Sequence, residues 1–236
     1  MEFWVFFKAK PLFWLIVTLI VFMLAVQLNK RAGGTPLLHP VLVALSTIIV
    51  FLMLTDTRYE TYFEGAQFIH FLLGPATVAL AVPLYDHFER VKALWLPLLV
   101  ACVTGAVTAI VTVLLVGMFF QLPADALLSL APKSVTSPIA IGIADKIGGH
   151  PSLAAGLVLI TGAMGCLLAP WLFKLLRVKD DALKGFAMGL AAHGFGTASA
   201  FEISAMAGAF AGLAMGMTGL LTAFILPFVV HIMGVG

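Results

Sequence analysis

The sequence has little charge and no long polar region. Only 10% of its 236 residues are Asp, Glu, Lys or Arg, whereas a soluble domain carries about 25%. Hydrophobic residues make up 62%, and the mean hydropathy is +1.12. These features exclude a water-soluble enzyme carried by one membrane anchor. They predict an all-α polytopic membrane protein that forms a single transmembrane domain over residues 1–236.

The sequence also has only two cysteines and little excess of basic over acidic residues. Cys102 and Cys166 lie in separate apolar runs, and the sequence contains no CxxC and no Cys/His cluster. No disulfide framework, metal site or cofactor is therefore expected. The net charge of +2 provides no basic bias of the kind that indicates a nucleic-acid partner.

Apolar runs long enough to cross a bilayer, about 20 residues each, are plentiful. The first is too long for a signal peptide, and no small-x-small cleavage site follows it. Division at the charged clusters gives seven predicted spans: 11–28, 36–55, 65–86, 93–120, 152–173, 185–202 and 205–233.

One further apolar segment, 123–147, does not fit a continuous helix. Pro132 and Pro138 flank a polar sequence in its middle, and prolines so placed break a helix. The segment either crosses the membrane, which makes eight spans, or enters and returns as a re-entrant hairpin.

The positive-inside rule favours the hairpin. A crossing segment divides the basic residues seven to five, with Lys8, Lys10, Arg58, Lys174, Arg177, Lys179 and Lys184 on one side and Lys30, Arg31, Arg90, Lys92 and Lys146 on the other. A re-entrant segment divides them eight to four, with Lys30, Arg31, Arg90, Lys92, Lys174, Arg177, Lys179 and Lys184 against Lys8, Lys10, Arg58 and Lys146. The second split is cleaner and predicts an external N-terminus and a cytoplasmic C-terminus.

Broken backbone is predicted at three places: at Gly74-Pro75, between Pro132 and Pro138, and in HGFGT at 193–197. Inside a bilayer such breaks survive only when they are buried in protein or line a wet cavity. KSVTSPIA aligns with HGFGTASA at an offset of 60 residues, and TGA recurs at 104–106 and 161–163. These short matches predict internal repeats, and paired interruptions are the usual pointer to a transporter site.

The second break contains four candidate ligand-binding side chains. Lys133 is costly at membrane depth, so it either snorkels to the surface or attracts an anion. Ser134, Thr136 and Ser137 either bond to nearby helix carbonyls or also face a ligand. We assign all four to a predicted substrate site.

The third break contains a second group of candidates. His193 and Thr197 lie one helical turn apart and can share a face, and Gly194 and Gly196 allow close backbone approach. His193 is interpreted either as a helix–helix hydrogen-bonder or as a residue facing a pore. Glu202 lies at the membrane surface or, if buried, becomes a proton-coupling candidate together with His193.

An intramembrane hydrolase is disfavoured because it needs a nucleophile–base pair. Ser199 and His193 are six residues apart, which places them on nearly opposite faces of a helix. No catalytic residue is therefore predicted.

Four stretches carry a family resemblance: PLLHPVLVAL, LLGPATVALAVPLY, LAPKSVTSPIAIGIADKIGG and AMGLAAHGFGTASAFE. They resemble the LrgB/CidB family of bacterial membrane proteins, and the resemblance runs from about residue 12 to the C-terminus. Ser199 stands where many members are expected to have arginine, which puts in doubt a second buried cation beside Lys133.

The resemblance implies a multi-pass protein of the bacterial inner membrane. It also implies holin/antiholin-like control of murein hydrolases and autolysis, together with a small LrgA/CidA-like membrane partner. Relatives include a plant plastid glycolate/glycerate translocator and bacterial pyruvate-uptake systems. A homo-oligomer is expected as well.

The residues favour a transporter over a holin. A holin needs only helices that oligomerise into a lesion and has no use for broken helices carrying Lys133 and His193. An anion carrier needs both, because half-helix N-termini and a lysine attract a carboxylate. We therefore predict transport of a small monocarboxylate of the pyruvate, lactate, glycolate and glycerate class. The substrate would be a small organic anion, and transport would be coupled to protons.

Overall fold

In the computed structural model, residues 11–35 and 38–234 are described, and within those ranges every regular element is a helix. Lys8 and Lys10 of the charge count, and residues 36–37 at the start of the second predicted span, lie outside the described residues. The described helices confirm an all-α membrane protein.

Among the described residues, five helices are long and apolar enough to cross a membrane: Pro11–Arg31, Tyr59–Asp86, Trp95–Phe119, Pro151–Leu175 and Ala205–Ile232. The prediction gave seven spans. The other two predicted spans are helical but differ in kind. Helix α3 (Pro40–Leu54) is a shorter apolar helix, and α12 (Asp181–Ile203) is interrupted at His193.

The chain divides into two compact units at residues 79 and 80. In unit 1, α2 (Pro11–Arg31) packs against α3 and against α4 (Tyr59–Phe71), and α5 (Leu73–Ala79) follows α4. Trp14 is fully buried at the centre of this unit. Its ring meets Phe51 and Tyr62 edge-on at 6.2 and 5.8 Å between centroids.

Unit 2 contains the remaining helices. Two short ones, α6 (Ala81–Asp86) and α7 (Phe88–Ala93), lead into α8 (Trp95–Phe119). There follow α9 (Ala124–Leu130), α10 (Ser137–Ile147), α11 (Pro151–Leu175), α12 and α13 (Ala205–Met233). Helices α8, α11 and α13 have at least 25 residues each, or about 37 Å of helix, which exceeds the hydrocarbon thickness of a bilayer.

The segment 123–147 is a hairpin, and we call α9, the link 131–136 and α10 hairpin 1. Its two ends meet, because His150 Nε2 lies 2.9 Å from Asp125 Oδ2 and the His150 backbone N–H donates to Ser129 Oγ at 2.6 Å. Gly149 permits this closure, since a Cβ at that position would lie 2.8 Å from the Ser129 backbone nitrogen. The segment therefore returns to the end of unit 2 from which it started, as the re-entrant prediction requires.

Helix α12 is also a hairpin, and we call it hairpin 2. Its first arm, 181–192, and its second arm, 194–203, are joined at His193, whose φ of 40° and ψ of −125° are not helical. The second arm folds back on the first: a Cβ built on Gly196 would lie 2.1 Å from Met188 O. The base of this hairpin closes where the Ser204 side chain lies close to Asp181.

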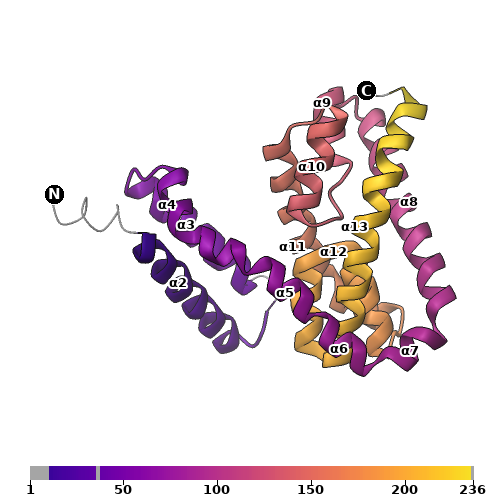
Figure 1. The fold of residues 1–236 in the computed structure, drawn as a ribbon, viewed down its shortest axis with the longest axis horizontal. Coiled ribbons are helices and arrows are strands. Elements are labelled where there is room, and N and C mark those ends of the chain that lie inside the picture. The colour runs from indigo at the N-terminus through magenta and orange to yellow at the C-terminus, as the bar shows by residue number, and fades with distance from the viewer. Residues whose placement is uncertain (1–10, 36–37, 235–236) are drawn as a thin grey trace. The chain divides into compact units, whose positions relative to one another are not determined.

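The hairpins open at opposite ends of α11. Hairpin 1 closes its base at His150, directly before α11 begins, and hairpin 2 begins at Asp181, shortly after α11 ends. Figure 1 shows α9 and α10 at one end of unit 2 and α12 toward the other. In both cases a long helix is followed by a hairpin: α8 by hairpin 1, and α11 by hairpin 2. The two pairs have the same connectivity and opposite orientation. This arrangement supports the predicted internal repeat.

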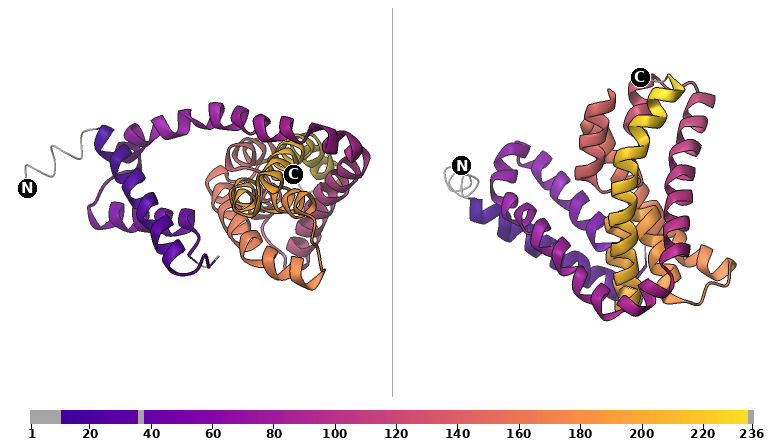
Figure 2. Two further views of the ribbon diagram at one scale, coloured as in Figure 1. Left: turned by 90° about the horizontal axis from the view of Figure 1, so that it is seen from below. Right: turned by 45° about the vertical axis from the view of Figure 1, so that its right-hand side comes forward.

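Helix α13 follows the length of unit 2 beside α8, as the right-hand view of Figure 2 shows. It runs parallel to the first arm of hairpin 2, because a Cβ on Gly185 would meet Ala207 O and one on Gly189 would meet Ala211 O. The contact between these helices is therefore backbone to backbone.

Lys92 and Lys179 lie at the same end of unit 2. Arg90 on α7 forms an ion pair with Asp180, the N-cap of α12, and each lysine is within two residues of this pair. The re-entrant hypothesis placed the two lysines on one membrane side, and the fold agrees with it.

Candidate functional site

The tips of the two hairpins approach each other near the middle of α11. Val135 in the link of hairpin 1 is buried in a cluster with Ala154 and Val158 of α11. The ring of His193, at the tip of hairpin 2, hydrogen-bonds through Nε2 to Val158 O at 3.0 Å. Both breaks are thus buried against the same turn of α11, which satisfies the requirement for broken backbone at membrane depth.

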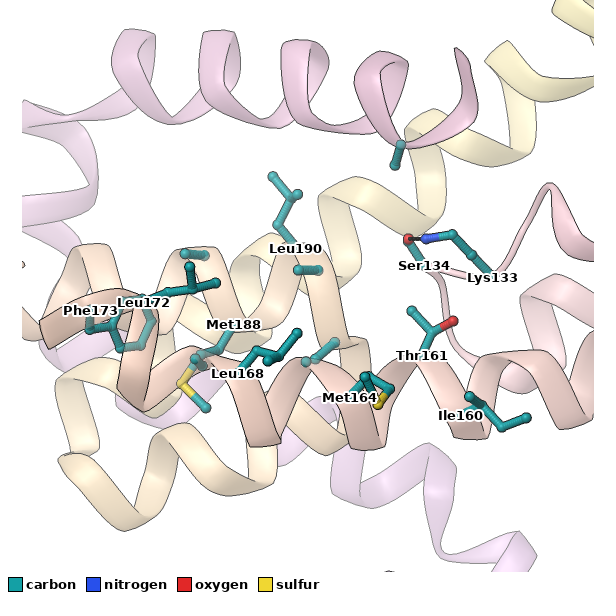
Figure 3. A pocket seen from close by; sticks show the side chains of 16 residues that line it. Lys133, Ser134, Ile160, Thr161, Met164, Leu168, Leu172, Phe173, Met188 and Leu190 are labelled. Carbon is teal, nitrogen blue, oxygen red and sulfur yellow. Dashed lines mark hydrogen bonds between the residues drawn. The ribbon is translucent and has the colours of Figure 1, made fainter. Parts of the chain in front are cut away.

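A cavity of about 520 Å³ lies beside the two tips, among α8, α11, the first arm of hairpin 2 and the link of hairpin 1. Its polar side chains gather at one end, where Lys133, Ser134 and Thr161 lie (Figure 3). The rest of the wall is apolar. A pocket of this size with a few convergent polar groups is the usual form of a small-molecule site.

Lys133 is the one basic residue of the cavity wall, and its side chain is partly buried. Its Nζ donates to Ser134 Oγ at 3.4 Å, a weak bond. Among the described residues, no carboxylate lies within ion-pairing distance of Lys133. The ammonium group therefore faces the cavity without an anionic partner from this part of the chain.

The other predicted residues of the second break occupy two positions. Ser134 lines the cavity. Thr136 is the extended N-cap of α10 and makes no side-chain capping bond, and Ser137 is the first residue of that helix. Both are half-buried at the tip, so they lie near the cavity without forming its wall.

His193 is buried, with 3% of its surface exposed. A carbonyl only accepts, so Nε2–H is the donor in the bond to Val158 O. Thr197 donates from Oγ1 to His193 O at 2.9 Å, which ties the tip to the second arm. Of the two interpretations of this histidine, its geometry matches the helix–helix hydrogen-bonder. The ring also lies within electrostatic range of Lys133.

The two glycines of the third break differ. A Cβ on Gly194 would have no neighbour within 4 Å, whereas Gly196 fits only because its Cα lies against Met188 O. Gly196 therefore permits the two arms to close on each other. Neither glycine lines the cavity.

Of the remaining predicted residues, Glu202 is not brought to the tips. It is exposed at the base of hairpin 2, beside Ser204, nine positions along the helix from His193, or about 13 Å. Gly74 and Pro75 lie at the start of α5 in unit 1. Pro132 is fully buried in the link of hairpin 1, and Pro138 is exposed in the first turn of α10.

Sequence reasoning missed the contribution of α11 to the site. Thr161, Met164 and Leu168 line the cavity, and Gly162 admits the tip of hairpin 2, since a Cβ there would lie 2.9 Å from the His193 ring. The TGA sequence at 161–163 was the available signal, but it had been interpreted only as evidence of a repeat.

Comparison with known proteins identifies the family. The model of the LrgB-like family matches residues 18–232. The chain is 36% identical over 216 residues to "Uncharacterized protein YxaC" of Bacillus subtilis. The aligned region covers 92% of this chain and 94% of that protein. It is 32% identical over 224 residues to "Antiholin-like protein LrgB" of Bacillus mycoides, with 95% and 97% coverage.

A search of solved structures finds no match. The resemblance seen in the motifs around Lys133 and His193 therefore rests on sequence, and it extends over nearly the whole chain. The chain belongs to the LrgB-like family.

Proposed function

We propose that this protein carries a small monocarboxylate across the bacterial inner membrane and binds the carboxylate where the two hairpin tips meet. The observation that carries the proposal is Lys133, a cation without an anionic partner among the described residues, on the wall of a cavity about 520 Å³ in volume. The predicted substrate class is that of pyruvate, lactate, glycolate and glycerate.

The electrostatics of the tips favour an anion. A lysine at bilayer depth costs about 2.5–3.5 kcal/mol on insertion scales, and a bound carboxylate offsets this cost. Helix α10 and the second arm of hairpin 2 both begin at the tips, so their positive ends add to the attraction. Ser134 offers a hydroxyl on the cavity wall.

The inverted arrangement supports a carrier rather than a lesion. Two hairpins that open at opposite ends of α11 give the buried site one potential gate toward each side of the membrane, and substrate sites at the interface of such repeats are common in transporters. Proton coupling through Glu202 and His193 stays a prediction. The two residues lie at opposite ends of one arm, so a proton path would have to follow the length of that arm.

The names of the relatives support a second candidate. A protein 32% identical to this chain is called antiholin-like, which favours regulation of murein hydrolase export and autolysis, with an LrgA/CidA-type partner and a homo-oligomer. An anion-binding membrane protein can also serve such a role if occupancy of its site regulates the partner.

Reconstitution separates the two candidates. Proteoliposomes would be tested for uptake of labelled pyruvate, lactate, glycolate and glycerate, with and without a pH gradient, and for release of a neutral dye. We expect saturable uptake that unlabelled carboxylate inhibits, with the dye retained. Dye leakage without carboxylate competition would favour the holin-type function instead.

Orientation is tested separately. We propose that the end of unit 2 containing Lys92 and Lys179 faces the cytoplasm, as the eight-to-four charge split predicts. Single cysteines at these positions, in a background lacking Cys102 and Cys166, should both react only from the cytoplasmic side. Labelling from opposite sides would contradict the hairpin topology.

A further inference from the structure

The cavity is much longer than a three-carbon acid requires. From Thr161 its wall follows α11 past Met164 and Leu168 to Leu172, which is about 16 Å of helix. Figure 3 shows these side chains in a row leading away from Lys133 and Ser134. Cavities of about 300–1,000 Å³ hold drug-sized ligands, and this one has a volume of about 520 Å³.

The cavity wall is polar at one end and apolar at the other. Polar groups lie at the Lys133 end, and Thr161 already donates its hydroxyl proton to Leu157 O at 2.8 Å. The far end is formed by Leu168, Leu172 and Phe173, with Met188 on the first arm of hairpin 2. It is a groove open on one side, since Leu168 and Leu172 are 45% and 39% exposed. A hydroxyl placed among these side chains would find no partner there, whereas a methylene would be favourably buried.

We propose that the cavity binds a medium-chain monocarboxylate, with its carboxylate at Lys133 and Ser134 and its aliphatic chain along α11 toward Leu172. This inference rests on the anion site of the proposed function and extends the substrate class from two- and three-carbon acids to longer unsubstituted ones. One cation matches one carboxylate, so dicarboxylates are disfavoured. Glycerate, whose hydroxyls would meet apolar wall, binds more weakly than an unsubstituted acid of equal length.

The test is a chain-length series on the full protein in nanodiscs. Acetate, butyrate, hexanoate and octanoate would be titrated, with binding followed by calorimetry. Affinity should rise about threefold to fourfold for each methylene added and level off when the chain reaches the end of the cavity. Titration of each acid into empty nanodiscs measures partition into the lipid, which is subtracted.

Two substitutions on α11 test where the aliphatic chain of the ligand lies. Leu168→Gln places an amide in the chain region, so it should lower octanoate affinity at least tenfold and leave acetate affinity unchanged. Leu175→Gln is the matched control, because Leu175 is on the same helix, 60% exposed and outside the cavity wall. If Leu168→Gln fails to fold, Leu168→Ala should show the same selectivity with a smaller loss.

The outcomes separate this inference from the function on which it rests. If acetate and octanoate bind equally through Lys133, the chain-length inference fails and the anion site stands. If no acid of any length binds, the proposed function fails as well. Octanoate binding that survives Lys133→Met, or a co-purified phospholipid that octanoate does not displace, would show that the cavity is a lipid groove and overturn the inference.

Discussion

The two hairpins of unit 2 turn at the same level of α11 but end differently. Hairpin 1 reverses through the six-residue link 131–136, which carries Lys133 and Ser134 on the cavity wall. Hairpin 2 reverses at the single residue His193, whose side chain is buried and bonded to Val158 O. One tip presents polar groups to a cavity, and the other uses its polar group to fasten itself to α11.

This difference shows how one architecture can serve two purposes. A long link leaves side chains that are not consumed by local hydrogen bonds, so they remain available to a ligand. A one-residue reversal needs close contact between its arms, which Gly196 provides, and its polar atoms are used within the protein. We therefore expect changes in hairpin 1 to alter binding and changes in hairpin 2 to alter stability.

The largest expected effect is on binding at hairpin 1. Lys133→Met should weaken carboxylate binding by roughly 100-fold or more, as removal of a buried charged partner commonly does, while the protein stays folded, since methionine has similar volume and no desolvation cost. Substrate-dependent thermal stabilisation measures this. Lys146→Met, an exposed lysine of the same hairpin, is the control, and wild-type affinity in Lys133→Met would remove the residue from the site.

The next effect concerns the close contact in hairpin 2. Gly196→Ala places a Cβ 2.1 Å from Met188 O, and the required shift of backbone should destabilise the protein by about 1–3 kcal/mol. Gly194→Ala has open space around its Cβ and should be neutral or stabilise the protein by up to about 1 kcal/mol. Thermal unfolding in nanodiscs compares the two variants. Equal stability would mean that the arms do not pack as described.

A smaller effect is expected at the tip of hairpin 2. His193→Leu removes the hydrogen bond to Val158 O and should cost about 0.5–1.5 kcal/mol, whereas His193→Gln keeps a donor and should cost less. Uptake measured against pH in His193→Gln tests the proton role separately, because glutamine does not titrate near neutrality. An unchanged pH profile would leave the histidine as an anchor alone.

The smallest effect lies at the base of hairpin 1, outside the membrane-spanning helices. The hydrogen bond from His150, followed by that from the Ala126 backbone N–H, lowers the pKa of the Asp125 carboxyl. Because the folded-state pKa is lowered, this carboxylate stabilises the fold above its ordinary pKa of about 3.9, and the contribution is lost as the pH falls through the folded value. Asp125→Asn should lower the Tm slightly at pH 7, and the difference from wild type should narrow as the pH falls below the ordinary pKa of about 3.9. A gap that does not narrow on acidification would assign the effect to packing.

The sequence determined the class of protein and the positions of the breaks. Low charge and apolar runs require membrane helices, and Pro132 and Pro138, which flank a polar sequence, favour a break over 132–138. These are local consequences of composition and backbone chemistry, so they could be predicted without knowing which helices touch. The same holds for the charge split that favoured a hairpin.

Only the tertiary structure decided what each polar residue does. In the sequence, His193 and Lys133 look alike, since each is a polar residue at a helix break. In the structure, His193 hydrogen-bonds to Val158 O of α11, whereas Lys133 lines the cavity. Glu202 is kept from Lys133 because the second arm extends to the base of hairpin 2. The apolar wall from Met164 to Leu172 could not be distinguished from an ordinary membrane helix face, because a cavity is formed by packing between segments far apart in the chain, which local sequence patterns do not record.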